Sequence, residues 1–582
     1  MYTSLNGLVK NVIIQKIQCI KIAAIGTQKG CESVENLILP VGIDSFERIR
    51  REGYYYVDKT GFIEELLRKT FEVNLITRPR RFGKTLCMNM LASFFDIKKD
   101  SRDIFAGLKI AGEAELCSVW MNQWPVLSLS LKSVEGLEFE YAYEQLQSVI
   151  SDCCLKMDYL LQSERVNKFD KELFERLSAK RGTREEVNNS IFTLTRMLSS
   201  YFDKPVIVLI DEYDVPLAKA SEHGYYTQML EAVRGLLGKA LKSNEFLKFA
   251  IITGCLRIVK ESIFTGTNNL VTDTISGERF SEYFGFTEPE VLKLLDDAAF
   301  PDHADEMRAW YDGYHFGKTD IYCPWDVLNH INRLQDQPDA KPESYWKNTS
   351  HNGIIRSFLM RTDLMVNEKF EKLLSGESIC QKVTEDLTYD VLHSSEENLW
   401  TILYLTGYLT QDGMQNGLVR LRIPNEEIKT LFTETVMEWF KDEISQKERQ
   451  DLFAALWEGN EEQATALLSD LLFDTISYHD YDESYYHAFL AGVFSGAGFA
   501  VESNYEYGLG RPDIVVTDKR RRRAIIIETK RAQKESQMKT QCEKALKQLE
   551  DKQYAKGFLK GYRDVICYGI SFFEKECLVK KS

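Results

Sequence analysis

Residues 73–85 read VNLITRPRRFGKT, an apolar strand-like run followed by a loop that ends in Gly-Lys-Thr. An apolar helical pattern follows directly, through Leu86, Met90 and Phe94. Backbone N–H groups at a helix N-terminus, a lysine and a hydroxyl are the groups that bind nucleotide phosphates and Mg²⁺. The order strand, loop, helix therefore predicts a phosphate-binding loop, although Arg78 stands where the usual pattern has its first glycine.

A second buried-strand run, VIVLIDE at residues 206–212, ends in two carboxylates. Ligands bind at the carboxyl ends of strands in doubly wound sheets, so this position suits nucleotide chemistry. We expect Asp211 to hold Mg²⁺ and Glu212 to polarise the attacking water, the alternative being a helix cap. A third run ends at Thr253, which can sense the γ-phosphate, and Arg257 beyond it can act as an arginine finger. A purely structural role is an equal alternative for these last two residues.

The composition bounds the class of protein. The chain has 582 residues, of which 44% are hydrophobic and 28% charged, as is ordinary for globular proteins of about three or four domains. No apolar run reaches the roughly 18 residues of a membrane span, and lysines interrupt the mildly apolar stretch at residues 12–25. We therefore expect a cytoplasmic protein without a secretory signal. Twelve scattered cysteines without a C-x-x-C pair, and eight dispersed histidines, predict reduced thiols and argue against a structural zinc.

Charge is unevenly distributed along the chain. The whole chain has a net charge of −15, whereas residues 500–582 hold 19 Lys and Arg against 12 Asp and Glu. An acidic body with a basic C-terminal module predicts that nucleic acid, with DNA favoured, is bound at the C-terminal end.

The pattern of elements divides the chain into four parts. Residues 1–36 lack turn signals and are interpreted as an N-terminal extension. Strand-like runs alternate with helical periodicity over residues 37–286, which predicts an α/β domain with a parallel sheet. Residues 287–468 are mainly helical and are interpreted as a lid or linker region, with aromatic residues that close a core rather than stack on bases. Residues 469–582 read helix, strand, strand, strand, helix, strand, an α+β module of ordinary domain size.

The C-terminal module places two acidic residues and a lysine on adjacent strand-like runs. Asp513 begins one run, and Glu528, Thr529 and Lys530 end the next, across a turn with five basic residues at 519–523. A hairpin symmetric about that turn puts Asp513 opposite Glu528, and Lys530 on the same face as Glu528. The basic turn is interpreted either as a solvated turn or as a contact for a DNA phosphate.

Two carboxylates and a lysine on one sheet face are the groups that metal-dependent phosphodiester cleavage needs. We expect Asp513, Glu528 and the backbone carbonyl of Thr529 to bind one or two Mg²⁺ or Mn²⁺ ions. Lys530 would orient or deprotonate the attacking water. The alternative is a salt-bridged edge hairpin without a metal.

These motifs resemble those of AAA-ATPase-like bacterial proteins fused to a C-terminal nuclease of the PD-(D/E)XK superfamily. The resemblance covers roughly residues 37–582 and includes LPVGIDSF at 39–46, YVDKT at 56–60, IDEYD at 210–214 and WYDGY at 310–314. In that family an arginine in place of the first loop glycine is the norm. The resemblance thus implies that the loop binds ATP through Arg81, Phe82, Gly83, Lys84 and Thr85.

The resemblance also implies a restriction-endonuclease-like α+β fold for the C-terminal domain. In this fold Glu483 would be the acidic residue of the first helix, close to the metal, and Gln548 a polar helper in a later helix. His487 is interpreted as a packing residue.

The sequence therefore predicts a P-loop ATPase that controls a Mg²⁺- or Mn²⁺-dependent nuclease, with a role in defence or in the maintenance of mobile DNA. The alternative is an ATP-dependent switch or scaffold whose nuclease-like domain binds nucleic acid or a partner without cutting. A homo-oligomer is expected if Arg257 acts as a finger on a neighbouring subunit.

Overall fold

The computed structural model describes residues 37–257, 270–346, 369–385 without 371, 387, 395–443, 446–475, 483–495, 500–503, 512–558 and 561–582. Ile38–Ser582 form a unit of their own. The predicted N-terminal extension at residues 1–36 lies outside the described residues.

The N-terminal domain is built on a five-stranded sheet in the order β2-β3-β4-β1-β5, with every neighbouring pair parallel. Strands β1 to β4 match strand-like runs expected from the sequence at residues 73–77, 126–131, 206–210 and 249–253, and β5 was not predicted. The strands are β1 (Val73–Thr77), β2 (Val126–Ser130), β3 (Val206–Asp211), β4 (Leu247–Gly254) and β5 (Leu270–Asp273).

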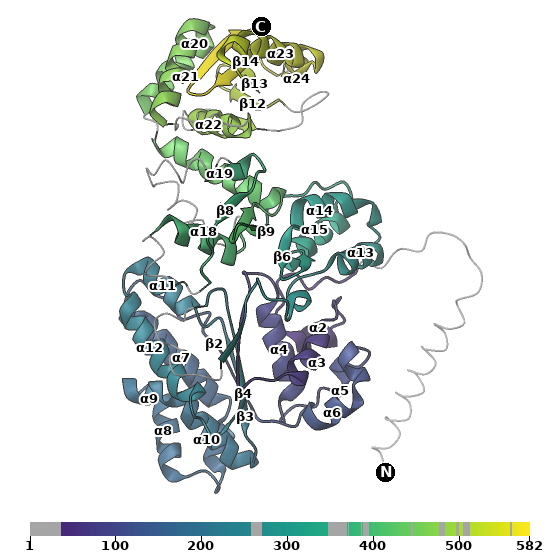
Figure 1. The fold of residues 1–582 in the computed structure, drawn as a ribbon, viewed down its shortest axis with the longest axis vertical. Helices are drawn as coiled ribbons and strands as arrows, with labels where there is room; N and C mark the ends of the chain where they lie inside the picture. The colour runs from purple at the N-terminus through teal and green to yellow at the C-terminus, as the bar shows by residue number, and fades with distance from the viewer. Residues whose placement is uncertain are drawn as a thin grey trace, which may run out of the picture. The chain divides into compact units, whose positions relative to one another are not determined.

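Every residue of β1 and of β3 is buried, as their continuous apolar sequences predict for strands that are covered on both faces. Figure 1 shows helices on both sides of this sheet. One group is α2 (Phe46–Arg51), α3 (Gly61–Arg68), α4 (Lys84–Phe95), α5 (Arg102–Phe105) and α6 (Ala114–Trp120). The other is α7 (Phe139–Leu155), α8 (Lys168–Ser178), α9 (Arg184–Asn188), α10 (Ser190–Phe202), α11 (Val215–His223) and α12 (Tyr226–Leu241).

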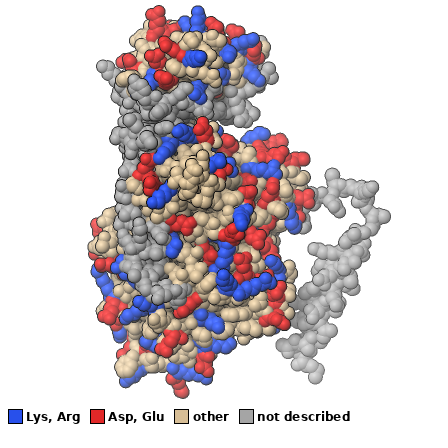
Figure 2. All heavy atoms as spheres, in the orientation of Figure 1, with Lys and Arg blue, Asp and Glu red and all other residues tan. Residues whose placement is uncertain are grey.

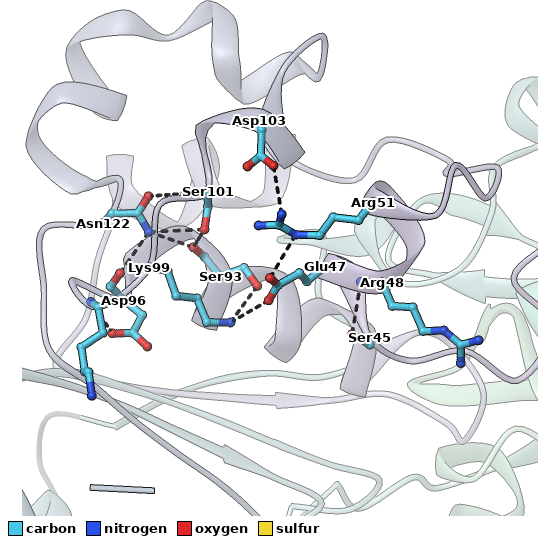
Figure 3. A network of polar contacts seen from close by, with 11 residues as sticks. Ser45, Glu47, Arg48, Arg51, Ser93, Asp96, Lys99, Ser101, Asp103 and Asn122 are labelled. Atoms are coloured by element: carbon cyan, nitrogen blue, oxygen red, sulfur yellow. Dashed lines mark hydrogen bonds and ion pairs between the residues drawn. The ribbon is translucent and has the colours of Figure 1, made fainter. Parts of the chain in front are cut away.

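A polar network holds the C-terminal end of α4, the helix that follows the predicted phosphate loop (Figure 3). The Asn122 amide donates to the carbonyls of Ser93 (3.1 Å) and Asp96 (3.0 Å), and the Ser101 hydroxyl donates to Ser93 (2.7 Å). Glu47 on α2 accepts from Arg51 in the same network. Because these bonds fix the far end of α4, they also fix the direction in which its N-terminus points.

The middle region contains small sheets in addition to the predicted helices. Its helices are α13 (Glu288–Asp297), α14 (Ala304–Tyr311), α15 (Pro324–Asp336), α18 (Glu396–Leu405), α19 (Glu426–Glu443), α20 (Gln446–Glu458) and α21 (Glu461–Thr475). An antiparallel pair, β6 (Tyr314–Phe316) and β7 (Thr319–Ile321), and a three-stranded sheet of β8 (Ile379–Gln381), β10 (Leu418–Arg422) and β9 (Thr410–Gln415) were not predicted. Tyr311 and Trp346 are buried, as expected for aromatic residues that close a core, whereas Trp310 and Trp325 are half-buried.

The C-terminal domain is a mixed sheet in the order β11-β12-β13-β14-β15. Its elements are α22 (Glu483–Ser495), β11 (Ala500–Ser503), β12 (Ile514–Asp518), β13 (Arg523–Arg531), α23 (Met538–Asp551), α24 (Tyr554–Phe558), β14 (Asp564–Phe573) and β15 (Glu576–Lys581). The predicted α+β order is present, and β15 is an additional edge strand.

Helix α21 covers part of that edge strand. The hydroxyls of Thr465 and Ser469 accept from the backbone N–H groups of Val579 (3.0 Å) and Cys577 (3.2 Å). The boundary expected between residues 468 and 469 falls inside this helix.

The ten cysteines in the part of the chain that the structure describes are free thiols. Its helices include none that combines the length and the apolar composition needed to cross a lipid bilayer.

Candidate nucleotide and nuclease sites

The predicted phosphate loop connects β1 to α4 and contains two residues in the left-handed conformation, Arg81 (φ 71°) and Gly83 (φ 80°). A Cβ atom on Gly83 would have no atom within 4 Å, so the backbone conformation is what favours glycine there. The Lys84 ammonium is buried and donates to the carbonyls of Arg78 (3.0 Å) and Pro79 (2.8 Å). The lysine therefore lies within the loop, at the N-terminus of the helix, where a phosphate group would be bound.

Arg78 explains how the loop forms without the usual first glycine. Its side chain is fully buried, donates to the carbonyls of Thr77 (2.8 Å) and Asp273 (2.9 Å), and lies over the rings of Phe284 and Phe316. Burial lowers the pKa of Arg78 to about 10, which leaves the guanidinium charged at neutral pH. Through these contacts the Arg78 side chain holds the phosphate loop in its conformation. Sequence reasoning did not assign this role to Arg78.

Asp211, at the end of β3, is held by hydroxyl groups from two other elements. Thr85 on α4 donates to its Oδ2 (2.7 Å), and Thr253 at the end of β4 donates to its Oδ1. The structure thus brings together Lys84, Thr85, Asp211 and Thr253, which the sequence had assigned to one nucleotide site. A carboxylate and a hydroxyl are oxygen ligands of the kind that Mg²⁺ prefers, so the donor set fits this ion.

Glu212 follows in a left-handed conformation (φ 53°), and its backbone N–H donates to the hydroxyl of Thr253 (3.4 Å). Burial raises the pKa of Glu212, the Lys84 ammonium opposes this shift, and the Asp211 carboxylate adds to it. A carboxyl with a raised pKa is a better proton acceptor near neutral pH than an ordinary glutamate. The raised pKa suits a side chain that polarises water.

Asp214 has a positioning role that sequence reasoning did not assign, although it stands in the IDEYD motif. Its Oδ2 accepts from the backbone N–H groups of Cys255 and Leu256, both at 2.9 Å. These bonds fix the segment that leaves β4, and Arg257 is the next residue. Residues 258–269 lie outside the described residues, and the finger role of Arg257 stays a prediction.

The second site lies on the β12–β13 hairpin, whose register confirms the predicted symmetry. Ile514 pairs with Ile527 and Asp518 with Arg523, so Asp513 and Glu528 occupy the next paired positions. Oδ2 of Asp513 accepts from both the backbone N–H and the hydroxyl of Thr529, each at 2.7 Å. Because both bonds engage Oδ2, Oδ1 is the oxygen of Asp513 that can serve as a metal ligand.

Glu528 is almost fully buried, at 1% exposure, and a buried carboxylate requires compensating groups. The Gln548 amide on α23 donates to its Oε1, and the Lys530 ammonium lies 3.6 Å from the same oxygen. The predicted helper Gln548 is therefore in contact with the predicted metal ligand. The Asp and Glu oxygens with a neighbouring lysine form a donor set that fits Mg²⁺ or Mn²⁺.

Helix α22 contributes to this site through His487, which is buried and has its Nε2 atom 2.6 Å from the carbonyl oxygen of Asp513. His487 is thus a packing residue, as expected, that also fixes the backbone of Asp513. Glu483 is the first residue of α22, and its side chain lies outside the described residues. The metal role of Glu483 stays a prediction.

The basic turn at residues 519–523 is tied to the hairpin at one end. Asp518 accepts from the Arg521 N–H (3.1 Å) and from the Arg523 side chain (3.1 Å), while the side chains of residues 519–522 are exposed. On the face drawn in Figure 2, basic and acidic side chains of the described residues are interspersed. The contact of this turn with nucleic acid stays a prediction.

Comparison with known proteins identifies both domains. Residues 40–264 match a family model described as "Predicted AAA-ATPase", and residues 481–582 match the PD-(D/E)XK nuclease superfamily. A protein of Azotobacter chroococcum mcd 1, described as "Uncharacterized protein in vnfD 5'region", is 27% identical over 557 residues, which cover 92% of this chain and 96% of the relative. The predicted fusion of an AAA-ATPase-like domain with a PD-(D/E)XK domain is confirmed.

The bond from Thr529 to Asp513 can be tested with a matched pair of substitutions. Thr529→Val removes the hydroxyl that orients Asp513 and keeps the shape of the side chain. We expect Mn²⁺ binding to the nucleotide-free protein to weaken by about 10- to 100-fold, the effect typical of removing a group that supports a metal ligand. Isothermal titration calorimetry measures this affinity.

Thr517→Val is the control, because the buried Thr517 hydroxyl on β12 has no hydrogen-bond partner among the described residues. It should leave the Mn²⁺ affinity unchanged. Equal affinities in both variants and the wild type would contradict the role of Thr529.

Proposed function

Because the chain joins an AAA-ATPase-like domain to a PD-(D/E)XK nuclease superfamily domain, we propose that it binds and hydrolyses ATP and thereby controls a metal-dependent nuclease. The placement of Asp513, Glu528 and Lys530 on one hairpin is the observation that carries the nuclease half. DNA is the favoured substrate, and a role in defence or in the maintenance of mobile DNA suits this pair of activities.

In the nuclease domain, Asp513, Glu528 and the Thr529 carbonyl would hold one or two Mg²⁺ or Mn²⁺ ions. Such ions supply charge that stabilises the scissile phosphate and lowers the pKa of bound water. Thr529 and His487 hold Asp513 in place through its carboxylate and its carbonyl. Gln548 orients Glu528, and Lys530 is placed beside the carboxylate to orient water or offset developing negative charge.

In the ATPase domain, Lys84 would exchange its two loop carbonyls for the phosphates of ATP. Thr85 and Asp211 would hold Mg²⁺, which supplies charge to the phosphoryl oxygens. Glu212 would accept a proton from water or orient it, and Thr253, already bonded to Asp211, would respond to the γ-phosphate. Arg257 would act on the phosphates of the same subunit or of a neighbour.

A continuous set of contacts leads from the phosphate loop into the middle region. Nη1 of Arg81 donates to the Tyr345 carbonyl (3.0 Å), and its guanidinium lies 5.4 Å and 5.3 Å from the ring centroids of Trp325 and Trp346. Arg81 is strained into a positive φ at the tip of the loop, so a nucleotide that reshapes the loop would move these contacts.

The contacts continue to the nuclease domain through α19. Its Glu427 is fully buried and accepts from the backbone N–H groups of Tyr345 (2.5 Å) and Trp346 (3.0 Å). The Trp346 indole donates to the buried Asp326 (3.1 Å), and burial together with Asp326 raises the pKa of Glu427 well above its ordinary value. Helix α19 packs against α22, which carries His487. We therefore assign the transmission of the nucleotide state to this path.

Substitution of Trp346 tests the path and leaves the residues assigned to both sites in place. Trp346→Phe removes the indole donor and part of the aromatic stack on Arg81. We therefore expect the change in cutting rate caused by ATP to be smaller than in the wild type by a factor of at least about three. The cutting rate in the absence of ATP should be unchanged. Rates of metal-dependent plasmid cleavage with and without ATP measure this effect.

Trp400→Phe is the matched control, because Trp400 is equally buried and also donates to a carboxylate, that of Glu396 (2.9 Å). The path would be refuted by a full ATP response in Trp346→Phe, or by an equal loss of response in Trp400→Phe.

The nuclease claim is tested by a near-isosteric change. Glu528→Gln should reduce plasmid and single-stranded DNA cleavage by at least about 100-fold, because the ligand loses its charge while its size is kept. ATP hydrolysis, measured by phosphate release, should continue in this variant. The control Glu543→Gln makes the same change at an exposed position of α23 and should cut as the wild type does.

The alternative is a nucleotide switch whose C-terminal domain binds nucleic acid without cutting. It would be favoured if the wild type and Glu528→Gln bind DNA equally and neither cleaves DNA or RNA with Mg²⁺ or Mn²⁺.

A further inference from the structure

Two histidines and a glutamate come together between α14 and α15. His303 precedes the first residue of α14, Glu306 lies in the first turn of that helix, and His330 lies in the middle of α15. One ligand atom from each of the three side chains lies within 4.8 Å of the other two. Sequence reasoning treated the histidines as dispersed, and His303 and His330 are 27 positions apart in the chain.

His330 is the feature that points to a ligand. Its side chain is fully buried, and neither Nδ1 nor Nε2 has a hydrogen-bond partner among the described residues. A neutral imidazole has one N–H donor and one lone-pair acceptor, and buried groups of this kind are nearly always satisfied.

The other two groups complete a recognisable donor set. His303 Nδ1 lies 3.1 Å from Glu306 Oε2, close to the separation of about 3.3 Å between two ligands of a tetrahedral ion with bonds of about 2.0 Å. Their side chains are 23% and 28% exposed, so they can rotate toward the buried His330. Lys341 lies 4.0 Å from Glu306 but is 71% exposed and is free to move away.

We propose that His303, Glu306 and His330 bind one divalent transition-metal ion, with Zn²⁺ as the first candidate and water in the remaining position. Two imidazoles and one carboxylate suit Zn²⁺, Co²⁺ or Fe²⁺ rather than Mg²⁺, which prefers oxygen ligands. The ion would join α14 to α15, the helix whose Trp325 lies under Arg81 of the phosphate loop. This site is independent of the two activities proposed above.

The test is metal binding by the full-length protein, purified without a histidine tag and stripped with a chelator. Zn²⁺ is titrated in excess Mg²⁺, which occupies the oxygen-ligand sites, and Co²⁺ is followed by its visible absorption. The wild type should bind one equivalent of Zn²⁺ tightly and give the Co²⁺ spectrum of a site with nitrogen ligands. Glu306→Gln and His303→Ala should weaken Zn²⁺ binding more than the 10- to 100-fold typical of changes behind the ligands.

His315→Ala is the matched control, because His315 also bonds to a carboxylate, that of Asp320 (2.8 Å), but belongs to no group of three such ligands among the residues that the structure describes. This variant should still bind one equivalent of Zn²⁺ and give the same Co²⁺ spectrum as the wild type. His330→Leu should lose both Zn²⁺ binding and the Co²⁺ spectrum. Its melting temperature, measured in chelator, shows whether the protein still folds with this buried substitution. Because the partly exposed His303 and Glu306 are tested separately, a failure of His330→Leu to fold does not decide the outcome.

Preference for Fe²⁺ over Zn²⁺, abolished in the same variants, would support the site with a different ion. The proposal would be overturned if the wild type bound no equivalent of Zn²⁺ tightly, or if Glu306→Gln and His303→Ala bound Zn²⁺ as tightly as the wild type.

Discussion

The Asp211 carboxylate joins three elements that are far apart in the sequence. Its two oxygens accept hydroxyl donors from Thr85 on the helix after β1 and from Thr253 at the end of β4. This arrangement depends on the sheet order, because β4 lies between β1 and β3 and brings Thr253 beside Asp211. At the carboxyl edge of this parallel sheet, the loop, the acidic strand and the β4 threonine thereby share one hydrogen-bonded unit, and this is where we propose that phosphate and Mg²⁺ bind.

The second site depends on a different constraint, the register of the β12–β13 hairpin. In the antiparallel hairpin of β12 and β13, register alone decides whether two carboxylates meet, because a slip of one residue would turn Glu528 to the other face. The bonds from Thr529 to Asp513 and from Gln548 to Glu528 then fix both side chains. His487 connects this hairpin to α22, so a movement of α22 against α19 reaches the backbone of Asp513. These contacts offer a physical route for the proposed control of the nuclease domain by the ATPase domain.

Much of this could be predicted from the sequence, because the strands that carry the sites are long apolar runs with distinctive ends. The hairpin register followed from a turn symmetric about its basic residues. Two of the strands that sequence reasoning missed, β5 and β15, lie at sheet edges, where the apolar signal is weak. Arg78 and Asp214 were missed because their roles depend on carbonyls and N–H groups that only the fold brings near. His330 was missed because its neighbours come from another helix.

The measurement that tests the central claim most directly is the rate of Mg²⁺- or Mn²⁺-dependent DNA cleavage by the full-length protein as the ATP concentration is increased. A parallel series with a non-hydrolysable ATP analogue separates binding from turnover. The account predicts that the cleavage rate changes with ATP, in either direction, and is half-changed at the concentration that half-saturates ATP binding. A cleavage rate that stays constant while ATP binds and is hydrolysed would contradict it, because the two domains would then act independently.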